Sequence, residues 1–201
     1  LASDNSPYAP QASAMREQTL NTIRLVNNLL DMARLQSGGV HLRGEWMAVD
    51  ELVGSTLRQL SVLLAGRHVA LDLPEMLLID VDGPLMERVL SNLLENALKY
   101  AGPAANIGIR ATQPSAQQLV LEVWDDGAGV ARGQEQLIFE KFSRGNKESA
   151  VPGVGLGLAI CQAIVTLHDG TIHVENRPQG GARFIITLPL TPPPVIEDYA
   201  Q

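Results

Sequence analysis

From about Gly44 onward, short stretches of alternating apolar and polar residues are interleaved with segments of helical periodicity. Strands are predicted at residues 45–49, 68–73, 76–81, 105–112, 119–124, 171–176 and 184–190. Helices are predicted at residues 50–64, 84–100 and 157–168. Strand pairs separated by helices favour an α+β fold, a two-layer α/β sandwich in which one mixed sheet is faced by helices.

Four local signals refine this arrangement. Residues 68–73 and 76–81 flank Pro74, and their alternation predicts a hairpin with one buried face. Asp82 is predicted to cap the helix at 84–100. Residues 125–152 are rich in glycine and charge and lack a steady period, so they are predicted to form a mobile lid. The pair Gly180-Gly181 is predicted to be a hairpin turn before the last strand.

A separate helix is predicted upstream of the sandwich, at residues 12–36. Spacings of four and three make a bundle seam from Thr19, Ile23, Val26, Leu30 and Ala33. A second apolar stripe runs beside it, made by Leu25, Leu29, Met32 and Leu35. This helix should therefore contact more than one neighbour and end at the two glycines 38 and 39. The chain divides into residues 1–39, a main domain at 40–191 and a tail at 192–201.

Composition excludes several classes of protein. Hydrophobic residues make up 45% and charged residues 18%, which excludes a disordered chain, and no apolar run approaches the ~20 residues that cross a bilayer. The net charge of −7 argues against nucleic acid as a partner. A single cysteine, Cys161, favours a reducing compartment and is predicted to pack in the core. The histidines show no zinc spacing, and His168 is interpreted as a favourable charge at a helix end.

One face of the helix at 84–100 carries an unusual polar stripe. Asn92, Asn96 and Lys99 lie at positions i, i+4 and i+7. Asparagine is a poor residue for a helix interior because its amide competes for backbone hydrogen bonds, so two on one face need a reason. The alternative is a plain solvated face, and this stretch alone does not decide between them.

Two glycine clusters lie on either side of the predicted lid. Asp125 follows an apolar strand and precedes Gly127 and Gly129, a pattern suited to recognising an amine such as that of adenine, or else a plain Asp-Gly turn. The second cluster opens the helix at 157–168, where unpaired N–H groups can hold phosphates. It lacks the Lys-Ser/Thr of a P-loop and does not directly follow a predicted strand.

The order of these motifs resembles the histidine kinase branch of the GHKL ATP-binding group over nearly the whole chain. In that family the asparagine-containing helix is the N box, the Asp-x-Gly-x-Gly turn the G1 box, a Phe-containing lid segment the F box and a glycine-rich helix start the G2 box. The F box is matched by residues 139–144. Residues 22–39 and 144–160 further resemble the potassium-responsive sensor kinases of the family.

The resemblance implies a site for ATP and Mg²⁺. Asn96 would be the metal ligand, Asn92 would support the phosphate region, and Asp125 would accept a hydrogen bond from the adenine amine. Lys99 and Arg144 would supply positive charge to the phosphates, and Tyr100 would line the pocket. The glycines would bring the backbone close to the nucleotide. The nucleotide-binding set implied is Asn92, Asn96, Lys99, Tyr100, Asp125, Gly127, Gly129, Phe139, Phe142, Arg144, Gly153, Gly155, Gly157 and Leu158.

Two features bear on the reaction. Hydrolytic members of the group carry a glutamate general base where this chain has Asn92, so transfer to a protein side chain is favoured over hydrolysis. None of His41, His68, His168 and His173 stands in the setting of a phosphoacceptor, so no catalytic residue of that kind is assigned. Residues 1–39 would be a remnant of the dimerisation and phosphotransfer domain, namely its second helix.

The implied function is that of a catalytic part of a two-component sensor histidine kinase, which donates the γ-phosphoryl group to a histidine absent from this chain. The implied partners are a response regulator that controls potassium-transport genes, the phosphoacceptor helix of the same kinase, and a second copy in the full-length homodimer. The implied location is the cytoplasmic portion of an inner-membrane sensor, with no direct membrane contact. The alternatives are a hydrolytic GHKL ATPase and an inactive binding or dimerisation module.

Overall fold

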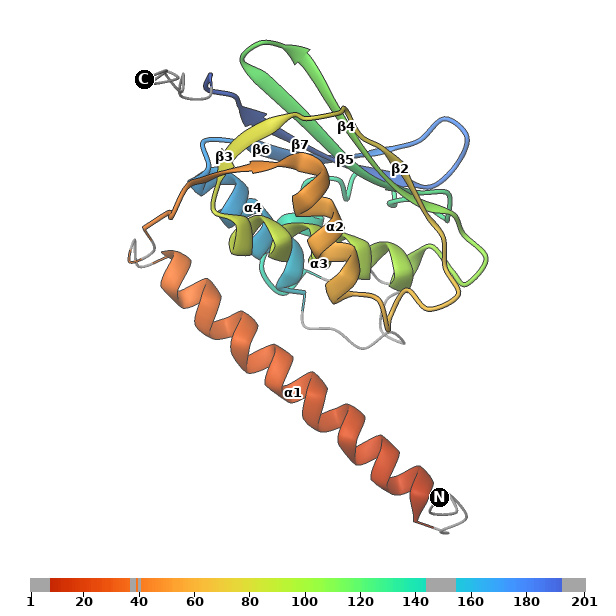
Figure 1. Cartoon of the computed structure of the whole chain (residues 1–201). Helices are drawn as coiled ribbons and strands as arrows, with labels where there is room; N and C mark the ends of the chain where they lie inside the picture. The colour runs from red at the N-terminus through yellow and green to blue at the C-terminus, as the bar shows by residue number, and fades with distance from the viewer. Residues whose placement is uncertain (1–7, 37–38, 40, 144–154, 193–201) are drawn as a thin grey trace, which may run out of the picture.

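A computed structural model describes residues 8–36, 39, 41–143 and 155–192. One long helix, α1 (Ala9–Gln36), projects from an α/β domain in which helices cover one face of a sheet (Figure 1). The predicted upstream helix and the two-layer sandwich are thus confirmed. The predicted end of α1 at two glycines falls partly outside the described residues.

The main sheet has five strands in the order β2-β4-β5-β7-β6. β2 (Val69–Asp72) runs parallel to β4 (Ile107–Ser115), and the other neighbours are antiparallel, so the sheet is mixed as predicted. The remaining strands of this sheet are β5 (Gln118–Asp125), β6 (Thr171–Asn176) and β7 (Ala182–Pro189). β6 and β7 form the predicted hairpin around Gly180 and Gly181.

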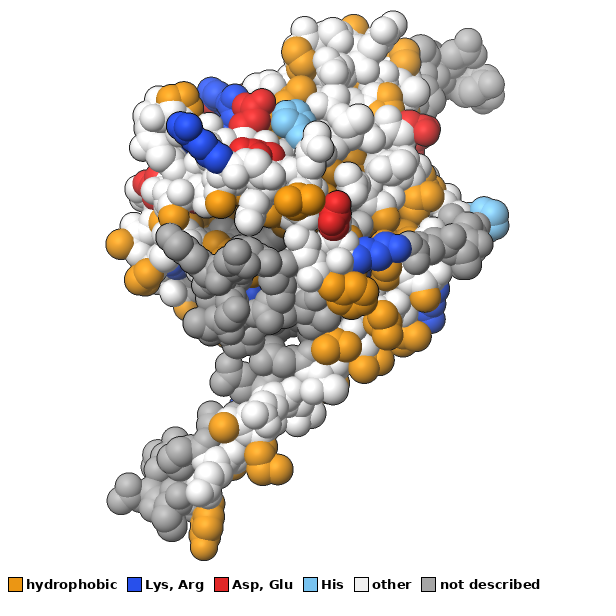
Figure 2. Space-filling view, turned by 180° about the vertical axis from the view of Figure 1, so that it is seen from behind, with side chains coloured by type: hydrophobic (Ala, Val, Ile, Leu, Met, Phe, Trp, Pro, Cys, Tyr) orange, Lys and Arg blue, Asp and Glu red, His pale blue; other side chains and the backbone are white. Residues whose placement is uncertain are grey.

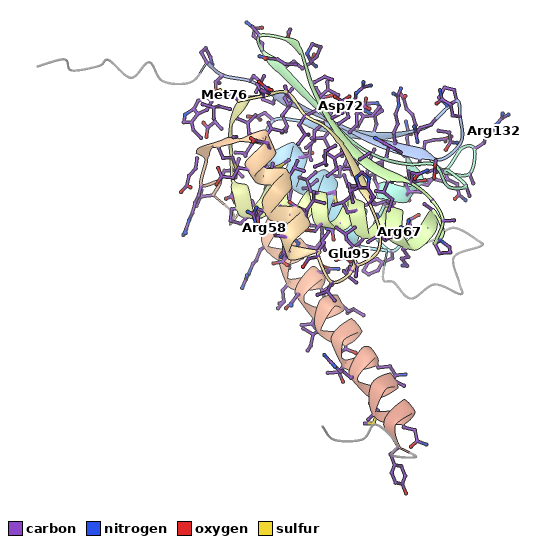
Figure 3. All side chains as sticks on the ribbon, turned by 45° about the vertical axis from the view of Figure 1, so that its right-hand side comes forward. Arg58, Arg67, Asp72, Met76, Glu95 and Arg132 are labelled. Carbon is purple, nitrogen blue, oxygen red and sulfur yellow. The ribbon has the colours of Figure 1, made fainter. Side chains whose placement is uncertain are left out.

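The predicted hairpin of residues 68–73 and 76–81 is wrong. β2 pairs with β4, whereas β3 (Leu78–Val81) pairs antiparallel with β1 (Glu45–Ala48) in a separate two-stranded sheet. Met76 lies on the connection between the two sheets, away from Asp72 at the end of β2 (Figure 3). Alternation marks which side of a strand is buried, but it carries no information about a partner far away in the sequence.

Three helices pack on the inner face of the five-stranded sheet: α2 (Val49–Gln59), α3 (Gly83–Tyr100) and α4 (Gly157–Leu167). The core between the layers contains completely buried side chains of helices and strands, among them Leu52, Leu90, Leu93, Ile109, Leu121, Ile160 and Ile186. Helix α2 ends earlier than predicted, yet Leu60 and Leu64 remain buried in the turns that follow it. The predicted cap is confirmed, because the Leu85 N–H donates to Asp82 Oδ1 at 3.2 Å.

Helix α1 meets the domain at its C-terminal end. The Arg88 guanidinium of α3 forms an ion pair with Asp31 and donates to Asn28 Oδ1 at 2.9 Å, and Met32 is buried nearby. Further along α1 the predicted seam is exposed: Ile23, Val26 and Leu30 are each about half accessible. Figure 2 shows apolar side chains gathered along this helix and where it approaches the domain.

Candidate functional site

The polar stripe of α3 lies at the boundary of the core. Asn92, Asn96 and Lys99 are half-buried, while the opposite face of α3 is fully buried. Asn92 Nδ2 donates to the Gly157 carbonyl at 3.4 Å, which joins the N box to the first residue of α4. Asn96 makes no hydrogen bond to any residue that the structure describes. The stripe is therefore not a plain solvated face, and one of its amides is available to a ligand.

At the end of the stripe, Lys99 and Tyr100 lie against each other. The Lys99 Nζ is 4.7 Å from the centroid of the Tyr100 ring, and Tyr100 is 41% exposed. Neither side chain is buried in the core, so both can contact a bound molecule.

Asp125 occupies the last position of β5 and is almost completely buried. Its Oδ1 accepts the N–H of Gly127 at 2.9 Å and that of Ala182 at 3.4 Å. Among the described residues, nothing donates to its second oxygen, Oδ2. In the part of the chain that the structure describes, only the Ser91 hydroxyl oxygen is completely buried without a hydrogen-bond partner, so Asp125 Oδ2 keeps access to solvent and can accept an N–H group from a ligand.

The turn after β5 is packed directly on the end of α3. A Cβ at position 127 would lie 2.4 Å from Cα of Ala101, the residue after Tyr100, so only glycine fits. A Cβ at position 129 would lie 2.5 Å from Asn176 Oδ1. The first contact places the turn that follows Asp125 beside the C-terminal end of α3, and both contacts give the two glycines a packing role within the protein.

Asp126, the variable position of this turn, is tied to the loop before β4. Its carboxylate accepts both the backbone N–H and the side-chain N–H of Asn106, each at 2.6 Å. The side-chain hydrogen bond from Asn106 is the main reason that the pKa of Asp126 lies below the ordinary value. These hydrogen bonds connect the turn to the loop before β4.

The predicted lid of residues 125–152 is wrong in its first half. A short 3₁₀ helix, η1 (Leu137–Phe139), places Phe139 in the core, where its ring meets Phe184 edge to face at 6.3 Å. The sequence did not reveal that Phe139 is buried, because the segment is rich in glycine and charge and a single buried aromatic residue produces no periodic pattern. Residues 144–152 of the predicted lid, including Arg144, lie outside the described residues, and so does Gly153.

The F box and the G2 box meet at the start of α4. The Phe142 N–H donates to the Gly155 carbonyl at 3.0 Å, while the Phe142 side chain is 61% exposed. Leu158 is partly buried and packs against the core. A Cβ at Gly155 would lie 2.6 Å from the Ser143 carbonyl oxygen, whereas one at Gly157 would make only an ordinary contact with Asn92 at 3.8 Å.

The predictions for Cys161 and His168 have different outcomes. Cys161 is fully buried as predicted, its thiol lies 3.7 Å from the Val89 carbonyl, and burial raises its pKa to about 12. The interpretation of His168 as a helix-end charge is wrong. Its Nε2 accepts the Asp82 N–H at 3.0 Å, so Nδ1 carries the proton and donates to the Ile164 carbonyl at 2.8 Å. A neutral ring satisfies both partners.

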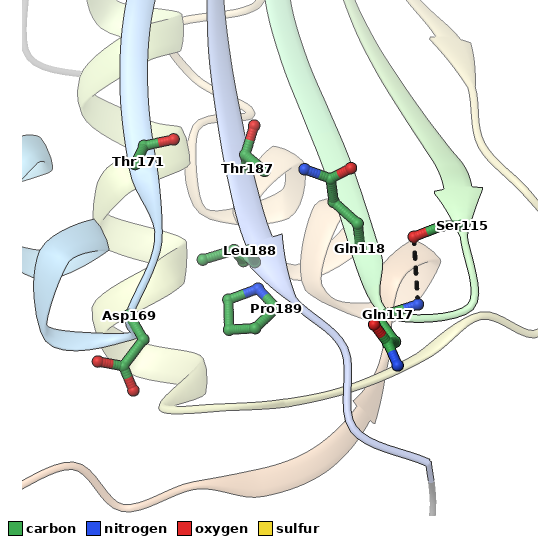
Figure 4. Close-up of a pocket in the computed structure, with 8 residues that line it drawn as sticks. All are labelled: Ser115, Gln117, Gln118, Asp169, Thr171, Thr187, Leu188 and Pro189. Carbon is green, nitrogen blue, oxygen red and sulfur yellow. Dashed lines mark hydrogen bonds between the residues drawn. The ribbon is translucent and has the colours of Figure 1, made fainter.

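Two open surface pockets lie elsewhere. One, of about 380 Å³, is shown in Figure 4 and is lined by Ser115, Gln117, Gln118, Asp169, Thr171, Thr187, Leu188 and Pro189. Gln118 begins β5 and Asp125 ends it, so this pocket is roughly 23 Å of strand away from the site. The other lies between α1 and α4, beside Met32 and Ala159. Neither contains the predicted nucleotide-binding residues.

The chain matches one known family of ATP-binding proteins. The family model described as histidine kinase-, DNA gyrase B-, and HSP90-like ATPase matches residues 81–192, more than half of the chain and all the described residues of the candidate site. The chain belongs to this family. The match begins just before α3 and ends after β7, so it includes the N box, the G1 box and the start of α4.

Individual relatives agree with this assignment. The sensor protein KdpD of Escherichia coli strain K12 is 60% identical over the whole chain, which corresponds to 22% of that protein. The mycobacterial sensor histidine kinase MprB has a solved structure with a TM-score of 0.66 and 26% identity, covering 74% of this chain and 99% of that one. The structure of full-length ShkA in complex with AMPPNP, at 24% identity, shares the fold alone, with a TM-score of 0.76, covering 96% of this chain and 40% of that one.

The chain spans about a fifth of the length of KdpD of Escherichia coli, and about the same share of two other relatives, KdpD of Clostridium acetobutylicum and the sensor histidine kinase TmoS of Ectopseudomonas mendocina. None of the helices that the structure describes is long and apolar enough to cross a membrane. Within the same residues, no group of three or more His, Cys, Asp or Glu side chains is placed to hold a metal ion.

Proposed function

We propose that this chain is the ATP-binding catalytic part of a KdpD-type sensor histidine kinase. It would bind ATP with Mg²⁺ and donate the γ-phosphoryl group to a histidine on a segment outside this chain. One observation carries the proposal. Backbone N–H groups hold one carboxylate oxygen of Asp125 in place, while no described residue donates to the other oxygen. The turn after Asp125 packs on the end of α3, the helix whose Asn96 amide also has no hydrogen-bond partner among the described residues.

On the purine side, Asp125 would accept a hydrogen bond from the exocyclic amine of adenine through Oδ2. The two backbone N–H groups at Oδ1 fix the carboxylate, so the acceptor is oriented before ATP arrives. A preoriented acceptor lowers the entropy lost on binding. Tyr100, Gly127 and Gly129 would line this side of the pocket.

On the phosphate side, the residues fit a magnesium site that is completed by the nucleotide. Asn96 offers an amide oxygen, and no cluster of carboxylates competes for the ion in the part of the chain described. When bound, magnesium would offset the negative charge of the triphosphate. Lys99 and Arg144 would add positive charge, Asn92 would support the phosphates, and Gly153, Gly155, Gly157 and Leu158 would form the phosphate-binding helix start. Phe139 and Phe142 would complete the nucleotide-binding set.

Transfer is favoured over hydrolysis by the chemistry of α3. An amide cannot take a proton from water, and the Asn92 amide is already directed at the Gly157 carbonyl. Glu95, labelled on α3 in Figure 3, projects about 100° away from Asn96 around the helix. Neither residue can act as general base at the terminal phosphate.

The partners follow from the resemblance to KdpD. We propose that the phosphoryl group passes to a KdpE-like response regulator that controls potassium-transport genes. Helix α1 would be the second helix of the dimerisation hairpin in a full-length homodimer, and its exposed seam fits that role. The chain would be a cytoplasmic portion of an inner-membrane sensor and would bind no nucleic acid.

Calorimetric titration with ATP tests the two sides separately. Asp125→Asn should weaken ATP binding about tenfold or more both with Mg²⁺ and in EDTA, because a hydrogen bond to a charged group contributes about 1.5–3 kcal/mol. Asn96→Ala should weaken binding only when Mg²⁺ is present. The control is Asn27→Ala, which removes an exposed asparagine of α1 and should change neither titration.

Transfer is tested by adding labelled ATP and a polypeptide that carries the phosphoacceptor helix. Label should reach its histidine with the unmutated chain and with Asn27→Ala, but not with Asn96→Ala. Absence of ATP binding by the unmutated chain would contradict the proposal. Rapid phosphate release without the added polypeptide would instead support a hydrolytic ATPase.

A further inference from the structure

The hairpin turn between β6 and β7 lies directly against the turn that follows Asp125. Arg177 Nη1 donates to the Asp125 carbonyl at 2.8 Å. Asn176 forms two hydrogen bonds with one backbone residue: its Oδ1 accepts the Val130 N–H at 2.7 Å, and its Nδ2 donates to the Val130 carbonyl at 2.8 Å. The first and last residues of the segment 125–130 are thus both held by one hairpin.

Arg177 is itself fixed by two further contacts, with the Trp124 ring and with the Gly181 carbonyl. Its guanidinium carbon lies 4.2 Å from the centroid of the Trp124 ring, a distance typical of a cation–π contact. That ring lies flat against Gly108 of β4, where a Cβ would approach it to 2.3 Å. The Arg177 backbone N–H donates to the Gly181 carbonyl at 2.9 Å, which closes the hairpin turn. Arg177 therefore has little freedom to move away from Asp125.

The backbone of the hairpin makes two further contacts with Asp125. The Ala182 N–H reaches Asp125 Oδ1, and Gly181 packs so tightly that a Cβ there would lie 2.0 Å from the Asp125 carbonyl oxygen. Asp125 is thus held at its side chain and at its carbonyl by residues more than 50 positions later in the chain. Any displacement of the hairpin would move the carboxylate.

We propose that Asn176 and Arg177 are positioning residues that set the selectivity for adenine. They would act through Asp125 and Val130, because both side chains are directed at the protein backbone rather than at a ligand. The inference rests on the proposed function, since it assumes that Asp125 Oδ2 recognises the amine of ATP. Neither residue belongs to the motifs by which the sequence resembles its family.

The test compares ATP with inosine triphosphate, which has a carbonyl oxygen in place of the amine. In the presence of Mg²⁺, Asn176→Ala and Arg177→Met should each weaken ATP binding about tenfold and change inosine triphosphate binding less than about twofold. The ratio of the two affinities should therefore fall. Arg177→Lys retains the charge and should restore part of the ratio. Arg183→Met, an arginine of β7 that pairs with Glu175 instead, is the matched control and should leave the ratio unchanged.

Equal weakening of both nucleotides would overturn the proposal, because it would indicate a general loss of structure. A second measurement uses the chain without nucleotide. Amide hydrogen exchange at Val130 should accelerate in Asn176→Ala while that at Val123 of β5 stays unchanged, and unaltered exchange at Val130 would also overturn the proposal. If the unmutated chain showed no preference for ATP, the proposed role of Asp125 would fail and this inference with it. The exchange data would still show whether the hairpin holds the turn.

Discussion

The two sides of the candidate site are built differently. The purine edge, residues 125–130, is held by hydrogen bonds from the β6–β7 hairpin and from Asn106, and it packs against the end of α3. The phosphate edge, Asn92, Asn96 and Lys99, has one long hydrogen bond to Gly157 and a ring contact with Tyr100. One edge is thus fixed by the protein, whereas the other offers groups that a ligand can complete.

This difference suits what each edge would bind. A flat base with fixed donors is recognised best by a rigid acceptor, because little order must then be created on binding. The geometry of a triphosphate with magnesium changes during phosphoryl transfer. Amide and ammonium side chains that the protein holds only in part can adjust to that change. Substitutions at the purine edge should therefore disturb the fold more than substitutions at the phosphate edge.

The largest effect is expected for Gly181→Ala at the purine edge. Position 181 has φ of 85°, and the new Cβ would lie 2.0 Å from the Asp125 carbonyl oxygen and 2.6 Å from Cα of Asp126. Left-handed backbone and overpacking each cost about 1–3 kcal/mol, so the free energy of unfolding should fall by about 3 kcal/mol or more. Urea unfolding measures it.

Gly133→Ala is the control for the backbone cost alone. Its φ of 79° is nearly the same, but nothing lies within 4 Å of the position that its Cβ would take. The loss should be about 1–2 kcal/mol, the cost of the left-handed conformation without a clash. Equal losses for the two variants would mean that the hairpin does not press on Asp125.

An intermediate effect is expected for Gly157→Ala at the phosphate edge. The added Cβ would make an ordinary contact with Asn92 at 3.8 Å, and alanine favours a helix over glycine by about 1 kcal/mol. The free energy of unfolding should therefore stay the same or rise slightly. Affinity for Mg-ATP should nevertheless fall about tenfold if the backbone approaches the phosphates here. Calorimetry and urea unfolding of the same preparation separate the two effects, and unchanged affinity would contradict the assigned role of Gly157.

The contrast between the edges also explains what could be predicted from the sequence. Local patterns located nearly every strand and helix, because burial on one face imposes a period of 2 or 3.6. The partners of β2 and β3 were not predictable, since pairing between distant strands leaves no local signal. The ordered motifs were enough to mark Asp125 and Asn96 as candidate ligand-binding residues, because groups that contact a nucleotide lie within short glycine- and asparagine-containing segments.

Asn176 and Arg177 had no such signal. An asparagine and an arginine around a hairpin turn are ordinary surface residues in sequence, and their contacts depend on bringing residue 125 beside residue 177. His168 shows the same limit, because its position near a helix end suggested a charge while its partner Asp82 lies 86 residues earlier. The sequence therefore indicates groups that would touch a ligand better than groups that hold them in place.

The smallest effect is expected at the exposed corner of the purine edge. Hydrogen bonds from Asn106 favour the charged form of Asp126, so its pKa in the folded chain lies below 3.8. A carboxylate with a lowered pKa contributes stability above the pKa of the unfolded chain, and that contribution is lost as the pH falls below 3.8 through the folded value. Asn106→Ala should return the pKa of Asp126 toward 3.8, as measured by NMR titration of the carboxyl carbon. ATP affinity at neutral pH should change little, because the hairpin still holds Asp125 and Val130. A large loss of affinity would show that the loop before β4, and not the hairpin alone, fixes the purine edge.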